Sequence, residues 1–456
     1  MRAAVGIFLR IAFRFYYRRV YVRDEALVPA EGPLLLVANH PNSLVDPALL
    51  IHILRRPVHF GARHRLFETP LGPILTALGV IPIVRLQDDP RSMRRNLDSI
   101  EVYANFLEQG RATAIFPEGL SQDSLQLAPV KNGAARIALR AEAGRDFRLG
   151  LHVVPVGLQF EPRRRFRGEA FVRFGQPLSV TDLATLHRER PRDALRELSG
   201  RIGKALTGLT VHVESIDRAW LVDRLSEVYF RRALGTGLLG TGRSGLHGEL
   251  RYRMAVCLNY FSGTDSEVVD QVERSLRRYD RLLKAAGVGS RLVEEPAYLL
   301  PGILAPVQAV IEIVVGFLPA VAGLVTGGVP YLLTRHMARY LASRNRHMPS
   351  LSIIHILIGA LAFPLAYVAE ILLVWRLLGT RAAGVFAILL VPAGLFALWF
   401  VRRVRKLAVH VSGRLASWLR LDEVARVRQA QRELLVLMDR VRARYLGEVF
   451  GIRPVG

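Results

Sequence analysis

A histidine and an aspartate stand six positions apart in a polar segment that follows an apolar run. Residues 37–47 read Val-Ala-Asn-His-Pro-Asn-Ser-Leu-Val-Asp-Pro, so the apolar run ends at Ala38 and His40 lies in the following turn. An imidazole can take a proton from a hydroxyl near neutral pH. A carboxylate on its other ring nitrogen would fix the tautomer and stabilise the imidazolium. This pattern predicts a general base, His40, supported by Asp46.

The same residues also fit a purely structural interpretation. Aspartate is a good N-cap, proline suits the first helical position, and a histidine can simply occupy a turn. The sequence contains no Gly-x-Ser-x-Gly segment, so a reaction at His40 would take its nucleophilic hydroxyl from a substrate. The spacing alone leaves both interpretations open.

A second polar segment follows another apolar run. Residues 114–123 read Ala-Ile-Phe-Pro-Glu-Gly-Leu-Ser-Gln-Asp. Glycine at position 119, after Glu118, would let backbone amides approach a ligand that a side chain would block. As composition alone, this segment is also an ordinary turn.

Three cations stand where a phosphate could bind. Arg63 and Arg85 each follow a predicted strand, and Lys131 precedes a predicted helix. Fixed cations at strand ends suit a phosphate, and arginine can bind it through two hydrogen bonds. Each of them could equally be a solvated surface residue.

Between residues 25 and 180, short apolar runs alternate with stretches of helical spacing. Five runs predict strands and three stretches predict helices. The strands are Leu34–Ala38, Gly79–Val84, Ala112–Phe116, His152–Leu158 and Glu169–Phe174; the helices are Pro47–Leu54, Met93–Gln109 and Lys131–Ala143. Such alternation is typical of an α/β domain with a largely parallel sheet.

The segments on either side of this domain are rich in arginine. Residues 1–24 mix arginines with aliphatic and aromatic residues and lack the unbroken apolar core of a signal peptide. They predict a basic amphipathic helix that either lies on anionic lipid headgroups or packs on the domain. Residues 181–300 predict a helical extension. The literal Gly-x-Gly-x-x-Gly at 235–240 has no strand-to-helix context and predicts a flexible loop, not a dinucleotide site.

Residues 301–405 contain three apolar stretches. Residues 382–401 carry no charge and suffice to cross the hydrocarbon layer, which takes about 20 residues as a helix. They and residues 351–375 are separated by a short linker and predict a transmembrane hairpin. Residues 302–333 are broken by prolines and glycines, so they either cross or form a re-entrant or interfacial helix pair. The basic cluster at 402–406 places its end in the cytoplasm, followed by an amphipathic cytoplasmic tail over 406–456.

Composition restricts the partners. The chain has 456 residues, 51% of them hydrophobic, and a net charge of +24. Such an excess predicts a polyanionic partner, and the apolar C-terminal third favours anionic membrane lipids over nucleic acid. Cys257 is the single cysteine, which excludes an intrachain disulfide and a cysteine-built metal site. The histidines show no metal-ligand spacing, so no metal is expected.

Four blocks in order resemble those of the glycerolipid acyltransferases. They are Asn-His at 39–40 followed by Asp-Pro at 46–47, Gly-Val-Ile-Pro-Ile-Val-Arg at 79–85, Phe-Pro-Glu-Gly at 116–119 and Val-Val-Pro-Val-Gly at 153–157. The resemblance covers roughly residues 20–180. It implies that His40, supported by Asp46, deprotonates an acceptor hydroxyl, which attacks an acyl thioester. It assigns glycerol phosphate binding to Arg85, Glu118 and Gly119.

Two departures point to one subgroup. Five residues separate His40 from Asp46 where the common pattern has four, and Ser121 replaces an arginine often found after the third block. Both are similar to the fungal-type glycerol-3-phosphate and dihydroxyacetone-phosphate acyltransferases, which also carry hydrophobic segments after the catalytic domain. The resemblance therefore adds Ser121 to the expected binding residues and favours an unacylated glycerol phosphate as acceptor.

These observations predict an integral membrane O-acyltransferase of phospholipid synthesis with its catalytic domain on the cytoplasmic face. The acyl donor would be acyl-CoA or acyl carrier protein, as a co-substrate, and no cofactor is expected. Two alternatives stay open: acylation of lysophosphatidate or another lysophospholipid, and a non-catalytic lipid-binding scaffold that keeps the fold.

Overall fold

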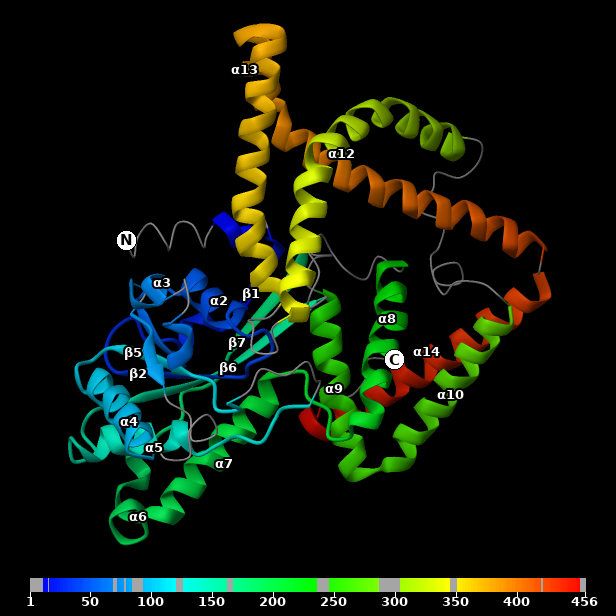
Figure 1. Cartoon of the computed structure of the whole chain (residues 1–456). Coiled ribbons are helices and arrows are strands. Elements are labelled where there is room, and N and C mark those ends of the chain that lie inside the picture. The colour runs from blue at the N-terminus through cyan, green and yellow to red at the C-terminus, as the bar shows by residue number, and fades with distance from the viewer. Residues whose placement is uncertain are drawn as a thin grey trace. The chain divides into compact units, whose positions relative to one another are not determined.

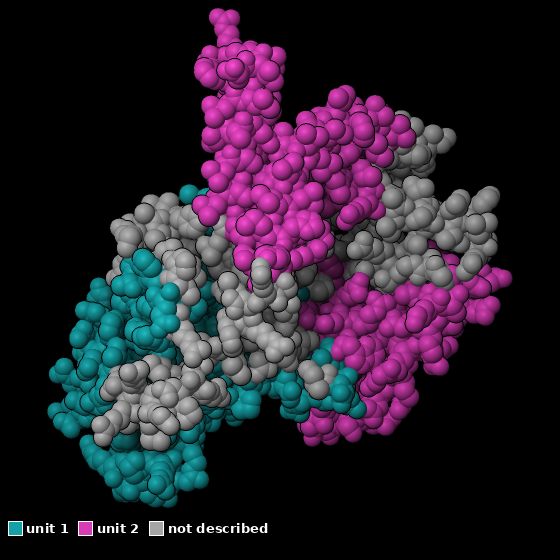
Figure 2. Space-filling view, in the orientation of Figure 1, with its two compact units in different colours: residues 1–219 teal, residues 220–456 magenta. Residues whose placement is uncertain are grey.

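A computed structural model describes most of the chain (Figure 1). The described residues are 11–14, 16–68, 72–77, 79–83, 93–119, 126–161, 167–235, 246–286, 304–344, 351–419 and 421–451. Residues 1–219 and 220–456 form two compact units (Figure 2).

The first unit is built on a seven-stranded sheet in the order β1-β7-β6-β2-β5-β3-β4. Its strands are β1 (Tyr17–Arg23), β2 (Leu34–Ala38), β3 (Val58–Arg63), β4 (Ile81–Ile83), β5 (Ala112–Ile115), β6 (His152–Glu161) and β7 (Gly168–Phe174). Only the β6–β7 pair is antiparallel. The predicted α/β domain with a largely parallel sheet is confirmed, and the five predicted strands form with small changes at their ends.

Helices pack on this sheet because its central strands are apolar on both faces. All five residues of β2 are buried, as expected of a strand covered on both sides. The helices of the unit are α2 (Val45–Ile53), α3 (Gly72–Ala77), α4 (Met93–Glu108), α5 (Gly133–Ala143), α6 (Ala184–Glu189) and α7 (Pro191–Leu209), with short 3-10 helices at Glu25–Leu27, His64–Leu66, Thr181–Leu183 and Ile216–Arg218. Helices α4, α5 and α7 share one apolar core with β2 and β6.

Two strands correct the sequence prediction. The helix predicted over residues 1–24 is wrong at its end, because Tyr17–Arg23 forms β1 and pairs in parallel with β7. The alternation of arginine with valine and tyrosine in this segment has the period of a strand. Phe13 is fully buried, as are Tyr16 and Tyr17 to within a few per cent. These aromatic rings therefore pack on the domain, while residues 1–10 lie outside the described part. Strand β3 corresponds to the strand expected before Arg63, but it extends through Arg63, which is its last residue.

Helix α7 belongs to the first unit, so the domain boundary expected at residue 180 lies too early. Its buried face, Ala194, Leu198, Ile202 and Leu206, completes the core over the sheet. The unit accordingly extends to Ala219.

The second unit contains a helical bundle and two long apolar helices. The bundle helices are α8 (Ala219–Gly235), α9 (Leu246–Thr264), α10 (Ser266–Ala285) and α14 (Leu421–Phe450). The amphipathic helix predicted in the tail is α14, and its apolar face, including Val427 and Leu434, is buried in the bundle core. That face is covered by protein.

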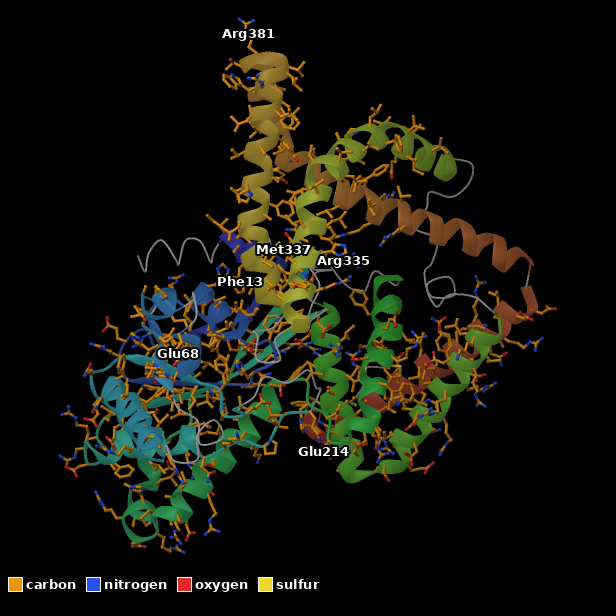
Figure 3. All side chains as sticks on the ribbon, in the orientation of Figure 1. Phe13, Glu68, Glu214, Arg335, Met337 and Arg381 are labelled. Atoms are coloured by element: carbon orange, nitrogen blue, oxygen red, sulfur yellow. The ribbon has the colours of Figure 1, made fainter. Side chains whose placement is uncertain are left out.

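The two apolar helices are α12 (Leu304–Arg344) and α13 (Leu351–Leu419). Val310–Leu341 and Ile358–Arg405 are long and apolar enough to cross a membrane, with mean hydropathies of 2.1 and 2.4. Helix α13 consists of two helices joined at Gly379, whose φ of 84° and ψ of 177° are not helical. The chain reverses there, with Arg381 at the tip (Figure 3). The helices predicted at 351–375 and 382–401 therefore form and meet at a reversal, and their crossing of a membrane stays a prediction.

Close packing of α7 against β6 generates a stability prediction. A Cβ at Gly157 would lie 2.3 Å from the carbonyl oxygen of Leu209, and backbone cannot move aside as a side chain can. We expect Gly157→Ala to lower the free energy of unfolding by about 1–3 kcal/mol, seen as a lower thermal midpoint in detergent. Gly200→Ala is the control, because that helical position has no atom within 4 Å. Equal stability of Gly157→Ala and wild type would show that α7 does not pack here.

Candidate active site

The structure brings His40 and Asp46 together in the loop between β2 and α2. The Nδ1 atom of His40 lies 2.9 Å from Oδ2 of Asp46. The Asp46 side chain is fully buried, whereas the His40 side chain is 16% exposed. When Nδ1 donates its hydrogen to the carboxylate, Nε2 carries the lone pair of a neutral imidazole. The pair therefore has the arrangement that a general base requires.

The longer spacing between His40 and Asp46 is absorbed by the backbone. Ser43 adopts a left-handed conformation with φ of 51°, which tightens the turn that contains the additional residue. The backbone N–H of Asn42 donates to Asp46 Oδ2 at 2.7 Å, so this oxygen accepts two hydrogen bonds from the loop. Asp46 is the second residue of α2 and not its N-cap, which is Leu44. The helix begins earlier than predicted, and its N-terminal dipole still favours the carboxylate.

Asn39 fixes the end of β2 to the neighbouring strand β6. Its Nδ2 donates to the carbonyl oxygen of Leu158 at 3.0 Å, and the Leu158 N–H donates to Asn39 Oδ1 at 2.6 Å. The side chain thus replaces a backbone partner where the strand pairing ends. Asn39 belongs to the first of the four blocks, but its position there does not predict this role. Its polar type beside a strand end was the available signal.

Glu118 holds the loop of His40 against the loop that follows β5. Its Oε1 accepts the backbone N–H of His40 at 2.7 Å, and its Oε2 accepts that of Ala128 at 3.1 Å. The residue is 6% exposed. Burial raises the pKa of the Glu118 carboxyl, and the two backbone donors oppose this rise. The resemblance assigned Glu118 to phosphate binding, but a carboxylate bound to two backbone amides is better placed to position His40.

Gly119 and Lys131 lie side by side at the carboxyl end of β5. Gly119 has a φ of 71°, a conformation that favours glycine. A Cβ there would come within 2.8 Å of the Lys131 Nζ, so the ammonium group covers the glycine. The Lys131 N–H donates to the Pro117 carbonyl at 3.0 Å. The pair places a positive charge beside a glycine that has no side chain of its own, as the predicted phosphate contact requires.

The ring of Phe116 stacks on the imidazole of His40. Their centroids are 4.2 Å apart and their planes differ by 19°. Phe60 in β3 stacks in turn on Phe116, at 6.4 Å. The ring contact limits rotation of the imidazole, so Phe116 helps to aim Nε2. The sequence offered no signal for this task beyond the presence of an aromatic residue in the third block.

The cavities among the described residues are small near His40 and larger elsewhere. A cavity of about 30 Å³ is lined by Asn39, His40, Pro41, Glu118, Gln126, Leu127, Thr210 and Val211. It has room for about one water molecule and is too small for an acyl acceptor. A cavity of about 450 Å³ includes His59 and Arg111. It lies at the amino ends of β3 and β5, whereas His40 and Glu118 follow carboxyl ends.

The structure does not describe the side chains of three residues that were expected to bind the substrate. Arg63 is the last residue of β3, and its side chain is not described. Arg85 and Ser121 lie outside the described residues. Within the described part of the chain, no three His, Cys, Asp or Glu side chains are grouped as metal ligands would be.

The residues around this site match a known protein family. Residues 19–159 match the family model described as Acyltransferase. Glycerol-3-phosphate O-acyltransferase 1 of Saccharomyces cerevisiae is 23% identical over 374 residues, covering 62% of this chain and 48% of that protein. Human 1-acyl-sn-glycerol-3-phosphate acyltransferase beta is 31% identical over 139 residues, covering 30% and 48%. Residues 19–159 are thus an acyltransferase domain, and the relatives it resembles are glycerolipid acyltransferases. The resemblance inferred from the four blocks is confirmed.

The extent of these similarities is limited. The chain spans about half the length of the curated relatives just named. The crystal structure of the 1-acyl-sn-glycerophosphate acyltransferase from Thermotoga maritima covers 44% of this chain and 77% of its own, with 20% identity and a TM-score of 0.32. The architecture of the acyltransferase domain therefore rests on its own strand order and pairing.

The buried carboxyl of Glu118 predicts a pH-dependent stability. Its pKa is raised above the ordinary 4.5, so the folded chain keeps the proton to a higher pH than the unfolded chain. Its contribution to stability is complete below pH 4.5 and is lost as the pH rises through the raised pKa. The measurement is the thermal midpoint of wild type minus that of Glu118→Gln. We expect this difference to be larger at about pH 5 than at about pH 8.

Glu189→Gln, at an exposed position, controls for the loss of one negative charge. A difference between wild type and Glu118→Gln that stays constant across this pH range would contradict the burial of the Glu118 carboxyl.

Proposed function

We propose that this chain is a membrane-bound enzyme that transfers a fatty acyl group to the hydroxyl of glycerol-3-phosphate or dihydroxyacetone phosphate. The observation that carries the proposal is the His40–Asp46 pair, with a buried carboxylate on Nδ1 and the imidazole reaching the surface. The acyltransferase family match and the yeast and human relatives support the same chemistry.

The reaction uses His40 twice. Nε2 removes the proton from the acceptor hydroxyl as its oxygen attacks the thioester carbonyl, and Asp46 stabilises the imidazolium that forms. The tetrahedral intermediate then expels the thiolate, which takes the proton from His40. The products are the acyl ester and the free thiol, and the imidazole is neutral again. Fixed amides and cations can meet the charge on the intermediate, so we propose no cofactor.

Lys131 is the described residue best placed to bind the acceptor phosphate. Its ammonium lies over Gly119, directly after the residue that holds the His40 backbone. Charge-assisted hydrogen bonds to phosphate are stronger than neutral ones. Arg63, Arg85 and Ser121 complete the proposed binding residues on the basis of sequence.

The first-step acceptor is favoured over lysophosphatidate by the longer match. The alignment with the yeast glycerol-3-phosphate enzyme extends over 62% of this chain, against 30% for the human enzyme named for the monoacyl acceptor. Two features of the sequence agree with this choice: the five residues between His40 and Asp46, and the serine at position 121. Acylation of lysophosphatidate is the second candidate, supported by the higher identity to the human enzyme.

The proposed location is the membrane, with the acyltransferase domain on the cytoplasmic face. Two helices have the length and hydropathy of membrane spans, and the net charge of +24 attracts anionic headgroups. The same positive charge would attract an acidic carrier protein or the phosphates of coenzyme A, either of which is the proposed acyl donor.

Transfer of a radiolabelled acyl group tests the catalytic role of His40. Purified protein in detergent is supplied with acyl-CoA or acyl carrier protein and with glycerol-3-phosphate, dihydroxyacetone phosphate or lysophosphatidate. We expect monoacyl product, and a loss of at least about 100-fold in His40→Ala because general base catalysis is removed. His152→Ala, an exposed histidine at the start of β6, should keep full activity.

The pattern of products decides among the candidates. Diacyl product from lysophosphatidate alone would select the second-step enzyme. Absence of transfer with every pairing, or equal activity of His40→Ala, would reject the proposed enzyme in favour of a lipid-binding scaffold.

A separate prediction concerns Lys131. Removing one charge-assisted contact to phosphate costs about 1.5–3 kcal/mol. We therefore expect Lys131→Gln to raise the KM for glycerol-3-phosphate roughly 10- to 100-fold, while the KM for the acyl donor changes little. Lys204→Gln, on the exposed side of α7, is the matched control. An unchanged acceptor KM in Lys131→Gln would remove Lys131 from the binding site.

A further inference from the structure

The contacts of α12 follow the second leg of α13 in reverse order. Glu312 accepts two hydrogen bonds from Arg403, with N–O distances of 2.8 and 3.2 Å. A Cβ on Gly316 would touch the ring of Phe400, and one on Gly323 would touch Ala393. The first part of α12 therefore runs antiparallel to the second leg of α13, toward the Gly379 reversal.

The last part of α12 contacts the other leg of α13. Thr334 lies beside Gly359, with its methyl group 3.6 Å from the position of a Cβ there. Gly359 is 20 residues from Gly379, a helical rise of about 30 Å. The partner of Gly327, by contrast, is Gly394, which is 15 residues from Gly379, a rise of about 22 Å.

This order of contacts indicates that α12 changes direction. A straight helix continuing past Gly327 would bring Thr334 closer to the Gly379 reversal, but Thr334 lies farther from it. Figure 1 shows α12 as an arch whose two ends point away from the tip of α13. Pro319 and Pro330 lie inside the helix, and prolines with neighbouring glycines are the usual cause of such bends.

The charges of this region separate toward the two ends of the α13 hairpin. The Glu312–Arg403 pair joins the start of α12 to the end of the apolar part of α13. Arg335 lies near the other end of α12, and Arg381 is at the tip of the hairpin (Figure 3). From Gly379 to Arg403 a straight helix would rise about 36 Å, and Pro392 lies inside the helix between them; the hydrocarbon layer is about 30 Å thick.

We propose that α12 is a re-entrant helix pair that enters and leaves one leaflet on the same side, so that only the two legs of α13 cross the membrane. The partner of its exposed apolar surface is the lipid of that leaflet. Residues such as Val314, Leu318 and Val325 are more than 60% exposed, and an apolar surface of this kind requires hydrocarbon around it. This inference rests on the proposed membrane location.

A complete crossing of the membrane by α12 would separate Glu312 from Arg403. If α12 crossed completely, three crossings would place Glu312 on the same side as Arg381 and opposite to Arg403. The ion pair could not form, and each charge would need another partner near the membrane. The positive-inside rule does not separate the two paths, because Arg335, Arg339 and Arg403 share one face in both.

Cross-linking tests the path directly in membranes. Cys257→Ala provides a cysteine-free full-length chain, into which Glu312→Cys and Arg403→Cys are introduced together. We expect a short bismaleimide to join this pair and to leave the control pair Glu312→Cys with Arg381→Cys unjoined. A full crossing of α12 predicts the opposite result, since positions 312 and 381 would then share one side.

Labelling of single variants gives an independent measurement. A membrane-impermeant maleimide is applied to sealed vesicles of each orientation carrying Glu312→Cys, Arg403→Cys or Arg381→Cys. Positions 312 and 403 should react from the same side, and position 381 from the other. Reaction of position 312 together with position 381 would overturn the re-entrant path.

Alkaline carbonate extraction separates this inference from the proposal on which it rests. If the wild-type chain stays in the membrane pellet while positions 312 and 381 share a side, only the re-entrant path fails. If carbonate releases the wild-type chain, the proposed membrane location fails and the re-entrant path with it.

Discussion

The carboxylate of Glu118 connects the two loops on which the site depends. One oxygen accepts the backbone N–H of His40 and the other that of Ala128. This bridge is possible because β2 and β5 are neighbours in parallel, so their carboxyl ends lie at one edge. The loop of His40 then carries Asp46 to the imidazole, and the loop after β5 carries Phe116 and the Gly119–Lys131 pair. Both oxygens of the buried Glu118 carboxylate accept backbone N–H groups. The carboxylate can therefore position the general base His40 without itself binding the phosphate of the acceptor.

Much of this arrangement could be predicted from sequence, and the remainder could not for physical reasons. Five strands follow from residue types, turns and apolar runs, which are local signals. The spacing of His40 and Asp46 left their pairing open, and the resemblance of the four blocks favoured it. Strand β1 was missed because arginines alternating with aromatic residues fit a surface helix as well as an edge strand. The stacking of Phe116 on His40 depends on two loops 76 residues apart in the chain, and no local pattern encodes it.

In the apolar region, too, local sequence patterns do not determine how the helices pack. Prolines and glycines in residues 302–333 left a crossing and a re-entrant pair open, because the apolar length suits a crossing and the breaks suit a re-entrant pair. The packing of α12 is the observation that favours the re-entrant pair we propose. Helix α12 meets one leg of α13 at Gly316 and Gly323 and the other at Thr334, and only tertiary contacts report that order.

A re-entrant α12 fits the chemistry proposed for the site. Acylation turns a water-soluble phosphate into an amphiphile, and each methylene that leaves water contributes about 0.8 kcal/mol. Such a product belongs in one leaflet, with its phosphate at the surface. An arch confined to one leaflet places Arg335 and Arg403 at the depth of headgroup phosphates, where guanidinium groups bind them well. A full crossing would place Glu312 and Arg403 on opposite sides and break their pair, so the arch is the path that keeps this charge pairing.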